Sequence, residues 1–365
     1  KVREALDALT LEKDGVDGSK IYLYGEGWNF GEVANGERGE NAVQLNMAGT
    51  GIGTFSDRLR DAVRGGGPFS GLREQGFASG LLHDPNTTDQ GSADAQRQKL
   101  LHYADQIRVG LAGNLRDYPL INRAGATVKG SQVDYNGQPA GYTVDPQEVI
   151  TYVSAHDNET LFDAIQLKAA PTASIEERVR MHNLALDLVL LAQGIPFIHA
   201  GDEMLRSKSL DRNSYNSGDW FNRIDFTYES NNWGVGLPPA GDNEGNWPIM
   251  GPLLANPALK PSRENIVSAV EHFNEMLQIR KSTAAFRQRT AEDIQSKVRF
   301  HNEGPEQIPG LIVMEINDAQ AEDGASNVVV LFNASDEQQA FTLSSYQDKP
   351  MRLHTVQQSS HDARL

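Results

Sequence analysis

Residues 149–158 read Val-Ile-Thr-Tyr-Val-Ser-Ala-His-Asp-Asn, an apolar and β-branched run that ends in three polar residues. A short run of this composition predicts a buried strand followed by a loop. The polar residues then stand at the carboxyl end of the strand, which is where parallel α/β proteins carry their functional side chains. His156 and Asp157 are therefore the first candidates for chemistry.

Three further runs have the same pattern. Residues 21–24 end at Gly25-Glu26-Gly27, residues 195–200 end at Gly201-Asp202-Glu203, and residues 107–112 form a weaker apolar run. Apolar residues at three- and four-residue spacing predict helices over 176–193 and 262–281. Strands that alternate with helices predict a parallel sheet, and long loops after the strands favour a (β/α)8 barrel over a doubly wound sheet.

A complete barrel needs eight strands, whereas this chain offers four. Lys1 also runs directly into an amphipathic pattern. We therefore expect an α/β fold in which residues 1–290 form the C-terminal half of a (β/α)8 TIM barrel, strands 5–8, with the N-terminal half missing. Strand-like runs at 311–316, 327–332 and 340–343 then predict a partial antiparallel β-sandwich over residues 291–365, also cut short.

Composition excludes several classes of function. The formal net charge is −16, which argues against nucleic acid as a partner because phosphate binding needs a basic face. The sequence has no cysteine, so disulfides and thiolate chemistry are excluded. No stretch has the apolar length of a transmembrane helix, so no membrane insertion is expected. The histidines have no metal-ligand spacing, and the metal content stays unknown.

Glu26 and Asp157 lie 131 positions apart, yet both follow predicted strands. In a barrel the strand ends converge, so these two carboxyls can face each other in one pocket. Glycosidic cleavage needs such a pair, because one carboxyl protonates the leaving oxygen while another stabilises positive charge on the sugar. On pattern alone, Glu26 could equally be a solvated loop carboxylate, and Asp157 could equally cap a helix.

Tryptophans support a sugar ligand, because sugar rings stack on flat aromatic faces. Trp28 and Phe30 follow Glu26 directly, and Trp28 is the best candidate for substrate contact. Residues 202–261 form a long segment without periodicity, which is usually functional or disordered. Its three tryptophans argue against disorder, and each is more simply interpreted as packing the loop. They are Trp220, Trp233 and Trp247.

Several segments, in this order, resemble the pullulanase and limit-dextrinase type of α-1,6-glucosidase in glycoside hydrolase family 13. They are residues 20–33 (Lys-Ile-Tyr-Leu-Tyr-Gly-Glu-Gly-Trp-Asn-Phe-Gly-Glu-Val), 46–69, 152–163 (Tyr-Val-Ser-Ala-His-Asp-Asn-Glu-Thr-Leu-Phe-Asp) and 194–226. The resemblance covers nearly the whole chain. It implies a debranching enzyme that hydrolyses α-1,6-glucosidic bonds in pullulan, amylopectin or limit dextrins with retention of configuration.

The resemblance also implies the roles of individual residues. Glu26 would be the general acid/base and Asp157 would stabilise the transition state. His156 would bind the sugar at the cleavage site, Trp28 and Phe30 would line the acceptor side, and the next sugar on the donor side would be bound by Asp211, Arg212 and Asp242. The family's nucleophile is an Asp in an Arg-x-Asp segment after the fourth barrel strand, which would lie upstream of Lys1. The chain by itself is then expected to be inactive.

Alternatives stay open. The chain could belong to a non-catalytic α-glucan-binding protein, or have isoamylase or α-amylase-type activity. A metal-dependent hydrolase lacks an evident set of ligands. The resemblance implies that no cofactor is required, and it allows a structural calcium ion. A branched α-glucan is the expected partner. The sequence leaves the oligomeric state and the compartment open, with a slight preference for an extracytoplasmic (secreted or periplasmic) location.

Overall fold

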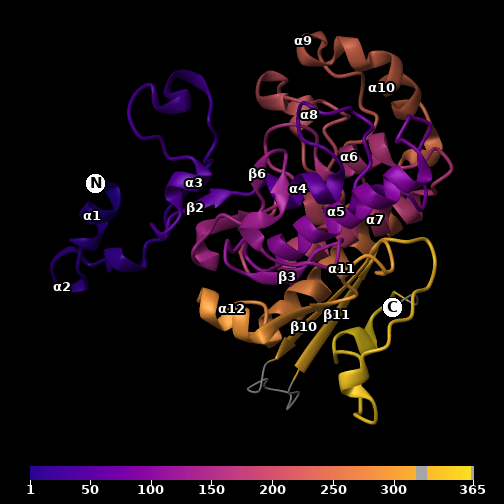
Figure 1. Cartoon of the computed structure of the whole chain (residues 1–365). Coiled ribbons are helices and arrows are strands. Elements are labelled where there is room, and N and C mark those ends of the chain that lie inside the picture. The colour runs from indigo at the N-terminus through magenta and orange to yellow at the C-terminus, as the bar shows by residue number, and fades with distance from the viewer. Residues whose placement is uncertain (318–326, 363–365) are drawn as a thin grey trace.

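The computed structural model describes residues 1–317 and 327–362 and contains a parallel sheet of four short strands (Figure 1). The strand order is β1-β2-β7-β8, and all three pairings are parallel. Within the described residues β1 and β8 are therefore the two edges. The strands are β1 (Tyr24–Gly25), β2 (Gly53–Phe55), β7 (Val149–Thr151) and β8 (Ile195–Pro196).

Helices connect consecutive strands of this sheet. The chain passes from β2 to β7 through α4 (Asp57–Arg64) and α5 (Ala93–Leu111), and from β7 to β8 through α6 (Leu161–Lys168) and α7 (Ile175–Leu190). After β8, α11 (Arg263–Ser282) packs against α7. Capping boxes at Ser174 and Ser262 set the first turns of α7 and α11. The two helices predicted at 176–193 and 262–281 are confirmed.

The strand predicted at residues 107–112 is wrong, because these residues form the last turns of α5. Every residue from Tyr103 to Leu111 is buried, since α5 lies between α4 and the C-terminal strands. Burial on all sides permits apolar residues at every position, so the helical periodicity that would identify α5 disappears. The second strand of the sheet is β2, within the 46–69 segment that sequence patterning left unassigned.

The C-terminal part begins with α12 (Ala291–Lys297) and continues as an antiparallel sheet in the order β11-β10-β9. Its strands are β9 (Val298–His301), β10 (Leu311–Asn317) and β11 (Asn327–Asn333). Residues 340–343 do not form a strand, so that prediction is wrong. Phe300, Ile312 and Met314 share one hydrophobic core with the helices. The division of the chain at residues 290 and 291 stays a prediction.

The long segment after β8 is held by a second apolar cluster, which includes Met204, Leu210, Trp233 and Met250. Trp233 is 4% exposed and meets Phe162 edge-on at 5.8 Å, so its predicted packing role is confirmed. Trp220 differs, with 65% of its surface exposed. The short helices of this segment are α8 (Asp219–Asn222), α9 (Ala240–Asn243) and α10 (Trp247–Leu254).

The remaining elements are short. The N-terminal helices α1 (Val2–Asp7) and α2 (Leu11–Asp14) project from the body in Figure 1, followed by α3 (Gln44–Met47) beside β2. Two small hairpins, β3 with β4 and β5 with β6, lie between α5 and β7. Their bounds are Pro119–Ile121, Thr127–Lys129, Asp134–Tyr135 and Gln138–Pro139. In the described part of the chain, no helix has the length and apolarity that a membrane crossing requires.

Candidate active site

Glu26 and Asp157 converge, as the strand-end argument predicted. Glu26 follows β1, and His156 and Asp157 lie in the loop after β7. One carboxylate oxygen of Glu26, one ring nitrogen of His156 and one carboxylate oxygen of Asp157 all lie within 4.8 Å of one another. His156 Nε2 is 3.4 Å from Asp157 Oδ1. All three side chains are exposed, so a ligand can reach them.

The backbone after β1 is fixed by Gly27. Its φ of 76° lies in the left-handed region, and a Cβ there would meet Thr54 Cβ at 2.8 Å. Only glycine combines this conformation with so close an approach to β2. The carbonyl of Gly27 also accepts a hydrogen bond from the Gln44 backbone N–H at 3.2 Å. The position of Glu26 therefore depends on the turn that Gly27 makes.

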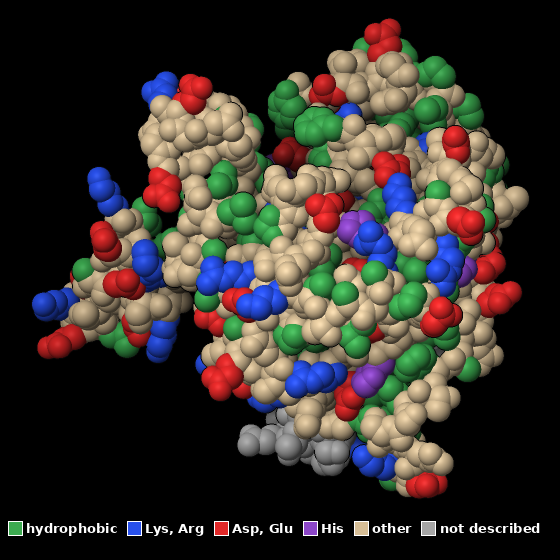
Figure 2. Space-filling view, viewed as in Figure 1, with side chains coloured by type: hydrophobic (Ala, Val, Ile, Leu, Met, Phe, Trp, Pro, Cys, Tyr) green, Lys and Arg blue, Asp and Glu red, His purple; other side chains and the backbone are tan. Residues whose placement is uncertain are grey.

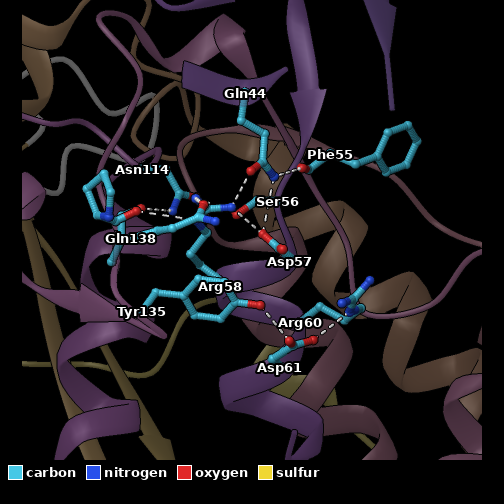
Figure 3. A network of polar contacts seen from close by, with 12 residues as sticks. Gln44, Phe55, Ser56, Asp57, Arg58, Arg60, Asp61, Asn114, Tyr135 and Gln138 are labelled. Carbon is cyan, nitrogen blue, oxygen red and sulfur yellow. Dashed lines mark hydrogen bonds and ion pairs between the residues drawn. The ribbon is translucent and has the colours of Figure 1, made fainter. Parts of the chain in front are cut away.

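A polar network beneath β2 separates the two halves of this site (Figure 3). Gln44 Nε2 donates to the carbonyl of Phe55 at 2.7 Å and to Asp57 Oδ1 at 3.2 Å. The fully buried guanidinium of Arg58 donates to both Gln44 and Asp57. Since β2 lies between β1 and β7, this network fixes the strand that spaces Glu26 from Asp157.

The loop after β7 is held from below by Lys208. Its ammonium group donates to the carbonyl of His156 at 3.2 Å and to that of Asn158 at 2.6 Å, the two residues that flank Asp157. Lys208 is 1% exposed, and burial lowers the pKa of its ammonium group. Asn158 has a φ of 63°, a conformation that Asn tolerates better than most residues. One buried side chain thus fixes the backbone on both sides of Asp157.

Asp163, in the first turn of α6, fixes the backbone at Lys208 through hydrogen bonds. Its carboxylate accepts from Ser207 Oγ at 2.6 Å, from the Lys208 N–H at 2.8 Å and from the Leu210 N–H at 3.2 Å. Burial raises the pKa of Asp163 to about 6, and these three donors oppose that rise. Sequence analysis gave no role to Lys208 or Asp163. No local pattern marks Lys208, because it stands among other charged residues, Arg206, Asp211 and Arg212.

The three residues predicted for the donor side form a second group. The side chain of Asn243 donates to Asp211 Oδ1 at 3.1 Å and its carbonyl oxygen accepts from the Arg212 N–H at 3.1 Å. Asn213 Nδ2 donates to Asp242 Oδ2 at 3.0 Å. Asp211 is fully buried, whereas Asp242 is exposed. The structure brings these residues together, and their contact with a sugar stays a prediction.

Trp28 and Phe30 stand at the start of the loop between β1 and α3. Trp28 is half-buried, and Phe30 is 63% exposed. Figure 2 shows a hollow between the part of the molecule that carries this loop and the main body. The contact of Trp28 and Phe30 with a ligand stays a prediction.

Glu26, His156 and Asp157 also have the spacing of a metal site, because a divalent ion can be bound by one nitrogen and two carboxylate oxygens. All three are exposed, and exposed acidic groups often cluster without an ion. The fit to a cation is therefore no better than the fit to a sugar. The structural calcium ion that the resemblance allowed stays a prediction.

A buried acid lies below the site. Asp202, which follows β8, accepts from Ser154 Oγ at 2.7 Å through Oδ2, while its buried Oδ1 has no partner among the described residues. Burial raises its pKa to about 7. His182 Nε2 donates to the Asp202 backbone carbonyl at 2.7 Å, and burial lowers the pKa of that imidazole to about 4. These groups link the ends of β7 and β8.

Comparison with known proteins gives a consistent result. Residues 228–365 match the family described as alpha-1,6-glucosidases, pullulanase-type, C-terminal. The chain is 52% identical over 99% of its length to pullulanase 1, chloroplastic, of Arabidopsis thaliana, and 42% identical over 94% of its length to the pullulanase of Klebsiella pneumoniae. The chain belongs to the pullulanase family. It spans 38% and 32% of the length of these two pullulanases.

Solved pullulanase structures resemble this chain in fold. The ligand-free Klebsiella pneumoniae pullulanase PulA superposes with a TM-score of 0.86 at 42% identity, over 93% of this chain and 32% of that one. Its maltotriose complex gives a TM-score of 0.81 at 44% identity, over 87% of this chain and 34% of that one. The pullulanase of Bacillus acidopullulyticus is more distant, with a TM-score of 0.56 at 26% identity. The mixed α and β fold of this pullulanase-family chain is thus shared with full-length pullulanases.

Proposed function

We propose that this chain supplies the acid/base and transition-state-stabilising carboxyls of an enzyme that debranches α-glucans by hydrolysing α-1,6-glucosidic bonds. The observation that carries the proposal is the approach of Glu26 and Asp157 to within 4.8 Å from strands far apart in the sequence. Membership of the pullulanase family supports the choice of α-1,6 bonds. Pullulan, amylopectin and limit dextrins are the proposed substrates.

In this mechanism Glu26 protonates the glycosidic oxygen as the bond breaks, and Asp157 stabilises the positive charge that develops on the sugar ring. His156, beside Asp157, donates a hydrogen bond to the sugar. Trp28 and Phe30 stack on the acceptor side, while the donor side is bound by Asp211, Arg212 and Asp242. Lys208 fixes the backbone that carries His156 and Asp157, so the stabilising charge is placed before the substrate arrives.

Retention of configuration is the proposed stereochemical outcome. Membership of the pullulanase family supports it. The carboxyl separation that distinguishes retention from inversion is the one between the acid and the nucleophile or base, and Asp157 has neither of the latter two roles. The family's third carboxylate, an Asp nucleophile in an Arg-x-Asp segment, would form the glycosyl-enzyme intermediate.

No strand end in the described residues, 1–317 and 327–362, carries such an Arg-x-Asp segment. We propose that the parallel sheet is half of a (β/α)8 barrel, that residues 1–290 form this half, and that residues 291–365 begin a β-sandwich domain. The other half would contribute the nucleophile. The free edges of β1 and β8 within the described residues are where the remaining strands would pair. An extracytoplasmic location and the absence of a required cofactor remain part of the proposal.

The decisive experiment uses a chimaera in which residues 1–365 replace the matching part of Klebsiella pneumoniae pullulanase. Glu26→Gln in that chimaera should lower kcat for pullulan about 10²–10⁴-fold, because the leaving oxygen loses its proton donor, while maltotriose binding persists. Glu32→Gln is the matched control, since Glu32 is an exposed carboxylate paired only with Arg38. Full activity of the Glu26→Gln chimaera would sink the assignment.

Two other functions make different predictions in the same chimaera. A non-catalytic glucan-binding protein would bind maltotriose but release no reducing sugar from pullulan before or after substitution. An isoamylase or α-amylase type of activity would act on amylopectin or on amylose in preference to pullulan. Activity that disappears with a chelator and returns with zinc would instead indicate a metal-dependent hydrolase.

A further inference from the structure

Trp220 presents a fixed aromatic face to solvent. It lies in α8 and is 65% exposed. Its indole Nε1 donates to the carbonyl of Val235 at 3.0 Å, and its own carbonyl accepts from Asn232 Nδ2 at 3.1 Å. The ring is thus held at its edge and through its backbone while its face stays free. Single exposed apolar side chains are common on protein surfaces, so the informative feature of Trp220 is the restraint of its ring rather than its exposure.

Polar side chains surround this ring. A groove of about 300 Å³ is lined by Asp219, Trp220, Asn222 and Arg223. Neither Asp219 nor Arg223 has a hydrogen-bond or ion-pair partner of its own within the described ranges. The two opposite charges balance, so the groove favours neither an anion nor a cation. The amide of Asn222 is bonded to Ser214 and Gly218, which leaves a carboxylate and a guanidinium at the rim. A flat apolar face with these two groups beside it suits a neutral ligand rich in hydroxyl groups.

The groove is linked to the proposed cleavage site by Arg206. Arg206 Nη2 donates to the carbonyl of Asn222 at 3.1 Å, and Nη1 lies 3.2 Å from His199 Nε2. Arg206 is two residues from Lys208, whose ammonium group donates to the His156 carbonyl at 3.2 Å. Figure 1 shows α8 in the upper part of the main body, below α9. It lies towards the loop between β1 and α3. A sugar chain that occupies the cleavage site could therefore continue towards α8.

We propose that the α8 groove is a further binding subsite for an oligosaccharide of α-linked glucose, with one sugar ring stacked on Trp220 and its hydroxyls hydrogen-bonded by Asp219 and Arg223. The choice of an α-glucan rests on the function proposed above, while the existence of a sugar site rests on the groove itself. The volume of about 300 Å³ is at the lower end for ligand pockets, which suits a short stretch of a sugar chain.

The test is calorimetric titration of the 365-residue chain with maltohexaose. Trp220→Ala should lower the affinity at least tenfold, and Trp220→Phe should retain most of it because a flat ring remains. Phe226→Ala is the matched control: Phe226 is 69% exposed in the same segment but does not line the groove, so its loss should leave the affinity unchanged. Circular dichroism establishes that each variant is folded.

Asp157→Asn separates this subsite from the cleavage site, because it removes a charge at the cleavage site and leaves the groove intact. Residual maltohexaose binding in Asp157→Asn that Trp220→Ala abolishes supports the subsite. Unchanged affinity in Trp220→Ala overturns it, and leaves the debranching function to be judged by the chimaera. Absence of any maltohexaose binding by the parent chain also overturns it, because all four lining residues are present.

Discussion

Lys208 is buried without a carboxylate in hydrogen-bond contact with its ammonium group. It donates instead to the carbonyls of His156 and Asn158. A buried charge is costly unless its hydrogen bonds are satisfied. The ammonium group of Lys208 therefore has to keep both carbonyls within hydrogen-bond distance, and this fixes the backbone on either side of Asp157. An apolar residue at position 208 would not do so.

Lys208→Met should loosen this loop. The two carbonyls lose their donor, which costs about 1–3 kcal/mol of stability, partly offset because a desolvated charge is removed. Amide hydrogen exchange over residues 154–159 should become faster, as measured by mass spectrometry. Lys129→Met is the control, since Lys129 forms only an exposed ion pair with Asp117, and it should change stability by less than about 0.5 kcal/mol. Unchanged exchange in Lys208→Met would contradict the positioning role.

Asp202 should make stability depend on pH. Its pKa is raised from 3.8 to about 7 by burial, so the folded protein binds a proton that the unfolded chain releases. The resulting stabilisation is fully present below pH 3.8 and is lost as pH rises through about 7. The side chain in Asp202→Asn is neutral at every pH. The free energy of unfolding of this variant, relative to that of the parent, should therefore rise by about 2–3 kcal/mol between pH 5 and pH 8.

Urea unfolding at the two pH values measures this difference. Glu40→Gln is the control, because Glu40 is exposed and its substitution removes the same charge without burial. If the difference in unfolding free energy between Asp202→Asn and the parent is equal at pH 5 and pH 8, the Asp202 carboxyl is not desolvated, contrary to its burial in the structure.

At the scale of elements, α5 provides one of the contacts between the helices of the parallel sheet and the C-terminal part of the chain. Arg108 of α5 is fully buried, and its guanidinium donates to Asp105 Oδ1 at 3.0 Å. It also donates to the carbonyl of Asn302 at 2.8 Å and to Gln307 Oε1 at 2.7 Å. One side chain therefore joins α5 to the turn between β9 and β10.

Arg108→Met should destabilise the chain by about 3–5 kcal/mol, because it leaves the buried Asp105 carboxylate without its partner. The double variant with Asp105→Leu should recover part of that loss, since both charges are then removed. Urea unfolding of the parent, the two single variants and the double variant gives the four free energies of a double-mutant cycle. Additive losses would mean that the pair is not coupled.

At the scale of the whole molecule, the sheet of four strands leaves large apolar side chains exposed on both of its edge strands within the described residues. Tyr24 of β1 is 53% exposed and stacks on Tyr22 with ring centroids 5.9 Å apart. Ile195 of β8 is 37% exposed. The chain spans about a third of the length of the pullulanases that it matches.

The chain of 365 residues should accordingly release no reducing sugar from pullulan, because the proposed nucleophile is not among its residues. The chimaera with Klebsiella pneumoniae pullulanase, which provides that nucleophile, should be active under the same conditions. Reducing-end release measures both. Turnover by the chain alone would show that two carboxyls, Glu26 and Asp157, suffice, and would overturn the three-carboxylate mechanism.

The convergence of Glu26 with His156 and Asp157 could be predicted from particular residues. The runs at 21–24 and 149–155 end at Glu26 and at His156-Asp157, and parallel pairing brings strand ends to one edge regardless of the residues between them. The strand at 107–112 could not be separated from a helix, since a helix buried on all sides has no polar face. Trp220 was assigned to packing, because composition does not say which tryptophan of a long loop stays at the surface.

The order of apolar runs and turns by itself determined the strands β1, β7 and β8, the helices α7 and α11, and the meeting of Glu26 with Asp157, because these follow from local periodicity and one rule of topology. Only the tertiary structure decided that Lys208 lies beneath His156 and Asn158, and that Trp220 faces solvent. Such contacts join residues tens of positions apart, and their energies depend on burial, which no local pattern contains.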